Sequence, residues 1–159
     1  MRISIKGGTE EQKLHAKQFC KFFAKKFFKD ELSKTLSVKI EHHPYVHDVT
    51  DLADCVWTDE EDPPKKYHIQ IFAPDDILLV NYLRTLAHEM VHVKQYAKGE
   101  LRQLPSTNNE VCKWLGKRYE WEMHYWDRPW EIDAHGREKG LVIDYGKAHN
   151  MGTTLQSMF

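Results

Sequence analysis

The segment HEMVH at residues 88–92 brings together side chains that can bind a metal ion and activate water. Two imidazoles stand four residues apart, and the carboxylate of Glu89 directly follows the first of them. On a helix, His88 and His92 project side by side one turn apart, which suits two nitrogen bonds of about 2.0–2.1 Å to zinc. Glu89 is turned away by about 100° and flanks such an ion, as a general base requires. The segment therefore predicts a zinc site that can carry out hydrolysis.

Chance is the alternative, because the chain is rich in both residue types. With 10 histidines and 13 glutamates among 159 residues, a random chain of this composition contains one HExxH with a probability of about 5%. The surrounding helix favours function, since an apolar stripe along it lies opposite a short polar seam. One cation would satisfy both imidazoles of this seam, whereas buried polar groups otherwise need separate partners. The seam consists of Asn81, Thr85, His88, His92 and Gln95.

A third metal ligand must come from elsewhere in the chain. Gln95 and Lys98 stand where the longer pattern HExxHxxGxxH has glycine and histidine, so that pattern is absent. Glu131 is favoured because a helix opening at Pro129 presents it in the first turn, where the helix dipole stabilises a carboxylate. The downstream candidates are His124, Asp127, Glu131, Asp133 and His135.

The two motifs resemble those of small single-domain zinc metallopeptidases of the gluzincin type, which include short phage and bacterial proteins. In this family HExxH is followed by an ExxA or ExxxD helix that supplies a glutamate ligand. RTLAHEMVHVKQ and, about forty residues later, RPWEIDAHGRE match this order over about fifty to sixty residues, with Glu131 as the glutamate and Ala134 as the small residue. The resemblance implies a zinc-dependent peptidase with Glu89 as its base. His135 departs from the thermolysin pattern, which has aspartate there.

Peptide hydrolysis also needs a group that stabilises the oxyanion. We favour His135, one helical turn from Glu131, and Tyr125, with structural packing as the alternative for each. Other side chains of suitable chemistry are Tyr96, Tyr119, His124, Arg128 and Arg137.

Two further polar segments leave a second metal site open. EHHPYVHD gathers His42, His43 and His47, but adjacent histidines on a strand point to opposite faces, which favours incidental histidines. The acidic segment 48–64 is expected to be a solvated loop, with calcium binding as the alternative.

Alternating apolar and polar residues predict strands near residues 2–5, 36–42 and 67–72, with a shorter one at CVWT. Together with the helices they predict one domain over 1–159 with an α+β, zincin-like fold. Its small twisted sheet packs on an N-terminal helix and the HExxH helix, and a C-terminal helix carries the third ligand. The segment YHIQIFA directly precedes the HExxH helix, and we expect its exposed edge to bind an extended substrate.

The helix boundaries follow from capping signals. Thr9 and Gln12 form a capping box that opens a helix from Glu10 to Lys29. The HExxH helix is expected to start at Asp75 or Asp76 and to stop at Gly99. A hairpin turning at Leu-Gly-Lys is expected within 110–126, followed by the helix opening at Pro129 with Asp127 as its cap.

Composition limits the partners. Lys plus Arg number 23 and Asp plus Glu 24, so no global field draws the chain to nucleic acid or to a membrane. Three widely spaced cysteines form no zinc ribbon of the kind found in the SprT-like proteases, which the chain is similar to in compactness, so a role on DNA is not expected. The cysteine pattern and the absence of an apolar N-terminal stretch predict a cytoplasmic protein. The resemblance to metallopeptidases implies a peptide or protein substrate. The oligomeric state stays open.

Two other functions are compatible with the same residues. A structural or interaction protein would close its zinc with a fourth ligand such as His124, His135 or Asp133, whereas an enzyme keeps an open position. A zinc hydrolase of another amide or ester would use the same chemistry.

Overall fold

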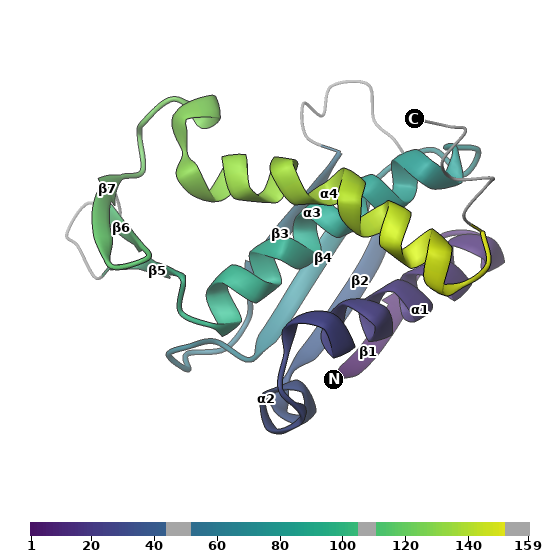
Figure 1. Cartoon of the computed structure of the whole chain (residues 1–159), viewed down its shortest axis with the longest axis horizontal. Coiled ribbons are helices and arrows are strands. Elements are labelled where there is room, and N and C mark those ends of the chain that lie inside the picture. The colour runs from purple at the N-terminus through teal and green to yellow at the C-terminus, as the bar shows by residue number, and fades with distance from the viewer. Residues whose placement is uncertain (44–51, 105–110, 152–159) are drawn as a thin grey trace.

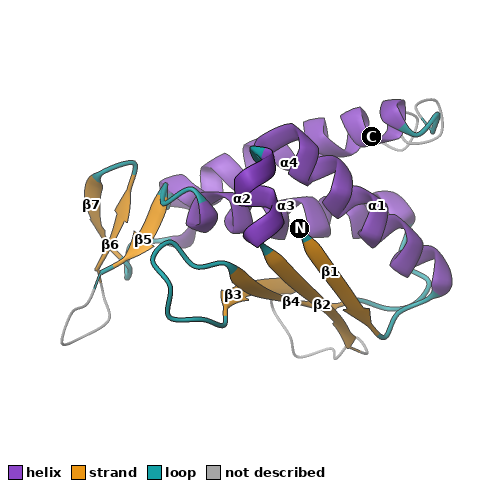
Figure 2. Cartoon of the chain, turned by 90° about the horizontal axis from the view of Figure 1, so that it is seen from below, coloured by secondary structure: helices purple, strands orange, loops and turns teal. Residues whose placement is uncertain are grey.

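Helices cover one face of a mixed four-stranded sheet in the computed structural model of the chain, which has the predicted α+β class (Figures 1 and 2). The structure describes residues 1–43, 52–104 and 111–151. In these ranges no helix is both long and apolar enough to cross a bilayer. Along the chain the elements are β1 (Arg2–Lys6), α1 (Glu10–Phe27), α2 (Asp30–Thr35), β2 (Ser37–His43), β3 (Ala53–Trp57), β4 (Lys66–Phe72), α3 (Leu79–Ala97), β5 (Leu101–Gln103), β6 (Val111–Trp114), β7 (Lys117–Glu120), the 3-10 helix η1 (Tyr125–Asp127) and α4 (Pro129–Ala148).

The main sheet has the strand order β1-β2-β4-β3, in which β1, β2 and β4 are parallel and β3 is antiparallel to β4. Ile40 of β2 and Ile69 of β4 are completely buried, because alternate residues of each strand face the helices. Strand β4 thus lies inside the sheet, and the prediction that YHIQIFA offers an exposed edge was wrong. The edge strands are β1 and β3, and in β3 Trp57 packs on Tyr96 of α3 with ring centroids 4.8 Å apart.

Helix α1 starts with the predicted capping box. Thr9 accepts a hydrogen bond from the backbone N–H of Gln12, and the Gln12 side chain accepts one from the backbone N–H of Thr9. The helix ends at Phe27 instead of Lys29, since the backbone of the next residue is extended. Its apolar face packs in the core, where Phe19 and Phe23 are completely buried.

Helix α3 is buried over most of its circumference. It starts at Leu79 and not at the predicted Asp75 or Asp76, because residues 74–78 first form a turn in which Ile77 donates to the carbonyl of Pro74. No side chain caps this end. Gly99 follows the helix with a φ of +66°, as predicted, a conformation that glycine adopts without strain.

The chain after α3 forms a second, three-stranded sheet in the order β5-β6-β7. The predicted hairpin is its β6-β7 pair, which turns at Leu115 and Gly116 with φ of 48° and 86°. Strand β5 was not predicted. Pro129 lies in the first turn of α4 as expected, but Arg128 takes the N-cap position because the predicted cap, Asp127, belongs to η1.

We expect Phe19→Ala to lower the free energy of unfolding by about 3–5 kcal/mol in urea denaturation. Phe19 is completely buried, and its ring centroid lies 5.3 Å from that of Tyr145 on α4. Leu14→Ala is the control, because Leu14 lies on the same helix but is 54% exposed, and it should change stability by less than about 0.5 kcal/mol. Equal losses in both variants would contradict the packing of α1 on α4.

Candidate metal centre

Three atoms that can ligate a metal meet between α3 and α4. Nε2 of His88 lies 3.2 Å and Nε2 of His92 lies 3.3 Å from Oε2 of Glu131, and the two nitrogens are 3.1 Å apart. A tetrahedral ion with bonds of about 2.0–2.1 Å separates its ligands by about 3.3–3.4 Å. The triangle therefore has nearly the size of one face of a zinc coordination shell.

Burial makes this triangle unfavourable without a cation. All three residues are more than nine-tenths buried. Oε2 of Glu131 is a buried atom to which no donor makes a hydrogen bond, although two imidazole nitrogens face it. An unsatisfied buried carboxylate oxygen costs free energy. A cation bound at the centre of the triangle would satisfy all three atoms together, so the residues fit the predicted metal.

The charges of the metal-free triangle also favour binding of a metal ion. Burial lowers the pKa of His88, but the carboxylates of Glu131 and Glu138 outweigh burial and raise this pKa to about 9. Burial raises the pKa of Glu131, but the two imidazoles outweigh it and hold the pKa well below its usual range. At neutral pH the metal-free site therefore holds a proton on His88 that a metal ion can replace.

Gln95 fixes the orientation of His92. Its Oε1 lies 2.8 Å from Nδ1 of His92, and its Nε2 donates to the carbonyl of Trp130 at 2.9 Å and to Asp133 at 3.2 Å. Because the Gln95 amide nitrogen has two acceptors, its oxygen must accept the Nδ1 proton of His92. Nε2 of His92 is then unprotonated and free to bind a metal.

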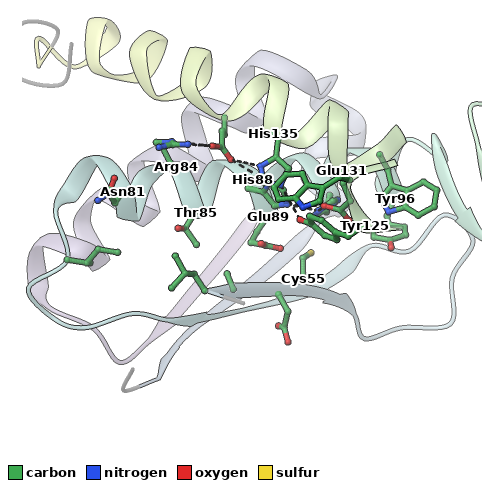
Figure 3. Close-up of a pocket in the computed structure, with 18 of the residues that line it drawn as sticks. Cys55, Asn81, Arg84, Thr85, His88, Glu89, Tyr96, Tyr125, Glu131 and His135 are labelled. Atoms are coloured by element: carbon green, nitrogen blue, oxygen red, sulfur yellow. Dashed lines mark hydrogen bonds and ion pairs between the residues drawn. The ribbon is translucent and has the colours of Figure 1, made fainter. Parts of the chain in front are cut away.

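Glu89 is buried on the side of α3 that faces β3, close to Cys55 (Figure 3). Burial raises the pKa of its carboxyl, and His92 and His88 lower it by a smaller amount, so the pKa stays above its usual value. A carboxylate with a raised pKa is a stronger base than an ordinary glutamate.

A cavity of about 700 Å³ connects these groups. Its floor carries the metal triangle and Glu89, and β3 lines one side with Ala53 and Cys55. The structure also places both predicted oxyanion residues in its wall: Tyr125 Oη lies 3.2 Å from His135 Nε2, and the rings of His135 and His88 are 4.4 Å apart (Figure 3). The aromatic residues in the wall are Tyr96, Trp121, Tyr125, Trp126 and Trp130.

The other ligand candidates do not join the triangle. Asp133 binds Arg137 at 2.6 Å and Gln95, and neither Asp133 nor His124 belongs to a group with ligand spacing among the described residues. Two such groups occur there, His88-His92-Glu131 and His88-His135-Glu138.

The histidine segment before β3 is described only in part. His42 Nε2 lies 2.8 Å from Tyr82 Oη, whereas His43 stacks on Phe72, so the two point to opposite faces as expected. His47 and residues 48–51 of the acidic segment lie outside the described residues. In the described part of that segment, Asp59 accepts from the backbone N–H of Lys65.

Sequence reasoning missed Arg84 and Glu138 and gave Gln95 no role. Each lies at helical spacing from a candidate ligand: Arg84 precedes His88 by four residues, and Glu138 follows His135 by three. This helical spacing was the signal in the sequence that pointed to both residues.

Comparison of the chain with protein-family models, with curated proteins and with solved structures found no match.

We expect the purified protein to hold about one equivalent of zinc, and Glu131→Ala to lose most of it, because one of three ligands is removed. Asp133→Ala and His124→Ala are matched controls that should keep the metal, since neither side chain lies in the triangle. Elemental analysis after gel filtration measures the ratio. Wild-type protein without zinc, and without uptake on reconstitution, would contradict the site.

Zinc binding should also depend on pH. Since the His88 pKa is about 9 without metal, zinc must displace a proton at neutral pH, and the affinity should rise with pH until it levels off above about 9. Calorimetric titrations in buffers of different ionisation enthalpy should show release of about one proton per zinc at neutral pH. A binding enthalpy independent of the buffer would contradict this.

Proposed function

We propose that the chain is a zinc-dependent metallopeptidase with a zincin-like fold. His88, His92 and Glu131 are its metal ligands and Glu89 is its general base. The observation that carries the proposal is that the ligand triangle borders a cavity in which a buried carboxylate with a raised pKa also lies. The resemblance of its two motifs to the gluzincin type supports the same function.

Held by His88, His92 and Glu131, zinc would supply a Lewis acid able to polarise a carbonyl and to lower the pKa of water towards ~7. The carboxylate of Glu89 accepts a proton from the attacking water, keeps it within the buried cavity, and delivers it to the leaving nitrogen. The Tyr125 hydroxyl and His135 Nε2 lie 3.2 Å apart, and both residues line the same cavity. They are our candidates for stabilising the oxyanion.

The substrate we propose is an extended peptide or protein segment. Strand β3 lines the cavity through Ala53, Asp54 and Cys55, and among the described strands it pairs only with β4. A peptide that adds to the outer edge of β3 would therefore run past the metal ligands, with its backbone held by hydrogen bonds to the strand.

The alternative of a structural zinc protein requires a closed coordination shell. In the described part of the chain no fourth ligating atom joins His88, His92 and Glu131 at ligand spacing, which favours an open position and hence catalysis. Hydrolysis of another amide or ester would use the same groups, but the strand edge beside the cavity favours a peptide. All three cysteines are free, and we propose the reducing cytoplasm as the site of action.

We expect Glu89→Gln to retain zinc and thermal stability while hydrolysis falls by about 10²–10⁴-fold or more. Glutamine keeps the size of glutamate but cannot accept the proton, and general-base catalysis contributes about this factor. Cleavage of an unfolded protein and of a random peptide library, analysed by mass spectrometry, measures the loss.

Glu31→Gln is the matched control, because Glu31 is exposed on α2 and does not line the cavity. It should cleave like the wild type. Near wild-type cleavage by Glu89→Gln would refute the role of the base, and a zinc-loaded wild type that cleaves neither substrate would favour the structural alternative.

A further inference from the structure

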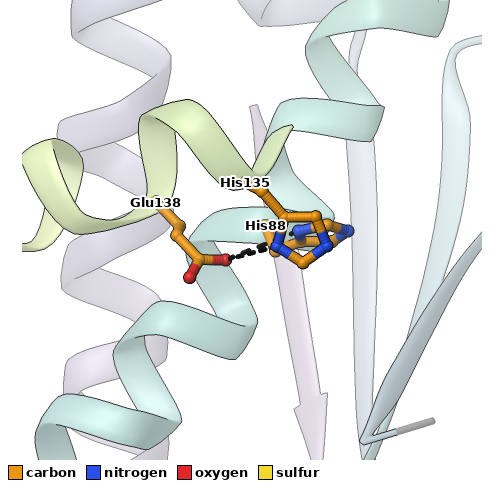
Figure 4. A group of neighbouring side chains, drawn as sticks. All are labelled: His88, His135 and Glu138. Atoms are coloured by element: carbon orange, nitrogen blue, oxygen red, sulfur yellow. Dashed lines mark ion pairs between the residues drawn. The ribbon is translucent and has the colours of Figure 1, made fainter. Parts of the chain in front are cut away.

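The carboxylate of Glu138 on α4 faces two imidazoles at once (Figure 4). Its Oε2 lies 3.5 Å from Nδ1 of His88 and 3.4 Å from Nδ1 of His135. Glu138 and His88 are both more than nine-tenths buried, and Nδ1 of His88 is a buried atom without a hydrogen-bond partner. The nearest acceptor for the Nδ1 proton of His88 is thus a carboxylate two helical turns from Glu131.

His88 and His135 both direct Nδ1 at Glu138, so Nε2 of each ring lies on the side away from this carboxylate. Nε2 of His88 points into the metal triangle, and Nε2 of His135 faces Tyr125 in the cavity. We propose that Glu138 is a positioning residue that sets the tautomer and ring orientation of both His88 and His135. This inference rests on the proposed function, because it assigns one carboxylate to a proposed zinc ligand and to the histidine beside Tyr125 in the same cavity.

The same three residues could instead bind a second cation, since their ligating atoms have suitable spacing. Arg84 opposes that alternative. Its guanidinium makes a charge-assisted contact with Oε1 of Glu138, with Nε at 3.2 Å, so the carboxylate already has a cation. A second metal ion would also need Nδ1 of His88 without its proton while Nε2 binds the first ion. A neutral imidazole has only one unprotonated ring nitrogen, so positioning fits the observed contacts better.

Arg84 completes the arrangement from the α3 side. It lies one turn before His88 on the same helix and holds Oε1, which leaves Oε2 turned towards the two imidazoles. A carboxylate behind a metal-binding histidine fixes the ring and raises its basicity, and loss of such a group costs about 10–100-fold in metal affinity or activity. Because Glu138 serves two rings, its loss should affect metal binding and turnover together.

Glu138→Gln tests the proposal in zinc-free and zinc-loaded protein. We expect zinc affinity, measured by competition with a chelator, to fall about 10–100-fold. The ¹⁵N signals of the His88 and His135 rings should shift, because Nδ1 of each ring loses its carboxylate neighbour. Turnover by zinc-saturated enzyme should fall through kcat, with little change in KM, because no substrate contact is removed. Glu138→Asp, which keeps the charge, should restore part of each loss.

Asp144→Asn is the matched control. Asp144 is a half-exposed carboxylate on the same helix that pairs with Lys26 at 2.7 Å, and its loss should change none of these measurements. If Glu138→Gln fails to fold, Arg84→Gln takes its place, since it loosens Glu138 without touching either histidine and should shift the ring signals in the same direction.

Two results would overturn the inference. One is unchanged zinc affinity and unchanged ring signals in Glu138→Gln. The other is a second equivalent of zinc in the wild type that is lost in this variant, which would make the three residues a cation site. Neither readout needs turnover, so a wild type that binds zinc without hydrolysing peptides would refute the proposed function and still leave Glu138 testable.

Discussion

The structure depends on the buried polar groups around His88 and His92 of α3. These groups include more carboxylates than lysine or arginine side chains that could neutralise them. The carboxylates of Glu89, Glu131 and Glu138 are each at least nine-tenths buried. Arg84 pairs with Glu138, but no lysine or arginine pairs with the other two among the described ion pairs. A buried charge without a partner is expensive. A divalent cation at the triangle would remove most of this cost, so metal affinity and folding free energy are coupled.

The remaining elements keep these polar groups in place. The apolar stripe of α3 packs on the sheet and on α1, with Leu83, Leu86 and Met90 completely buried. With that side occupied, the polar side of α3 has to face α4 and the cavity. Strand β3 then lies across from Glu89, so the proposed base shares one cavity with the proposed metal ligands and with a strand that has a free edge. Geometry suited to hydrolysis thus follows from how a single helix distributes its polar and apolar residues.

Local patterns in the sequence predicted what depends on one element, and failed where two elements must meet. The spacing of His88 and His92 and the capping box at Thr9 are properties of one helix, and both appear as predicted. Glu131 was chosen with help from a family resemblance, and the structure brings it to the two histidines. Alternation located the strands but carries no information about their order, so β4 was mistaken for the edge. The contacts of Glu138 with Arg84 and His88 were missed for the same reason, since they depend on how α4 crosses α3.

The composition of α4 explains why these contacts matter for the helix itself. Gly136 and Gly140 lie inside this continuous helix. A Cβ added at either position would meet no neighbouring atom within 4 Å, so close packing does not explain why these positions are glycine. Each glycine costs about 1 kcal/mol relative to alanine in a helix interior. No side chain caps the start of the helix either. Helix α4 therefore owes its order to tertiary contacts such as those of Glu131 and Glu138 with α3. A metal ion that strengthened those contacts would also stabilise the helix that supplies the proposed third ligand, so metal binding and the order of α4 would be coupled.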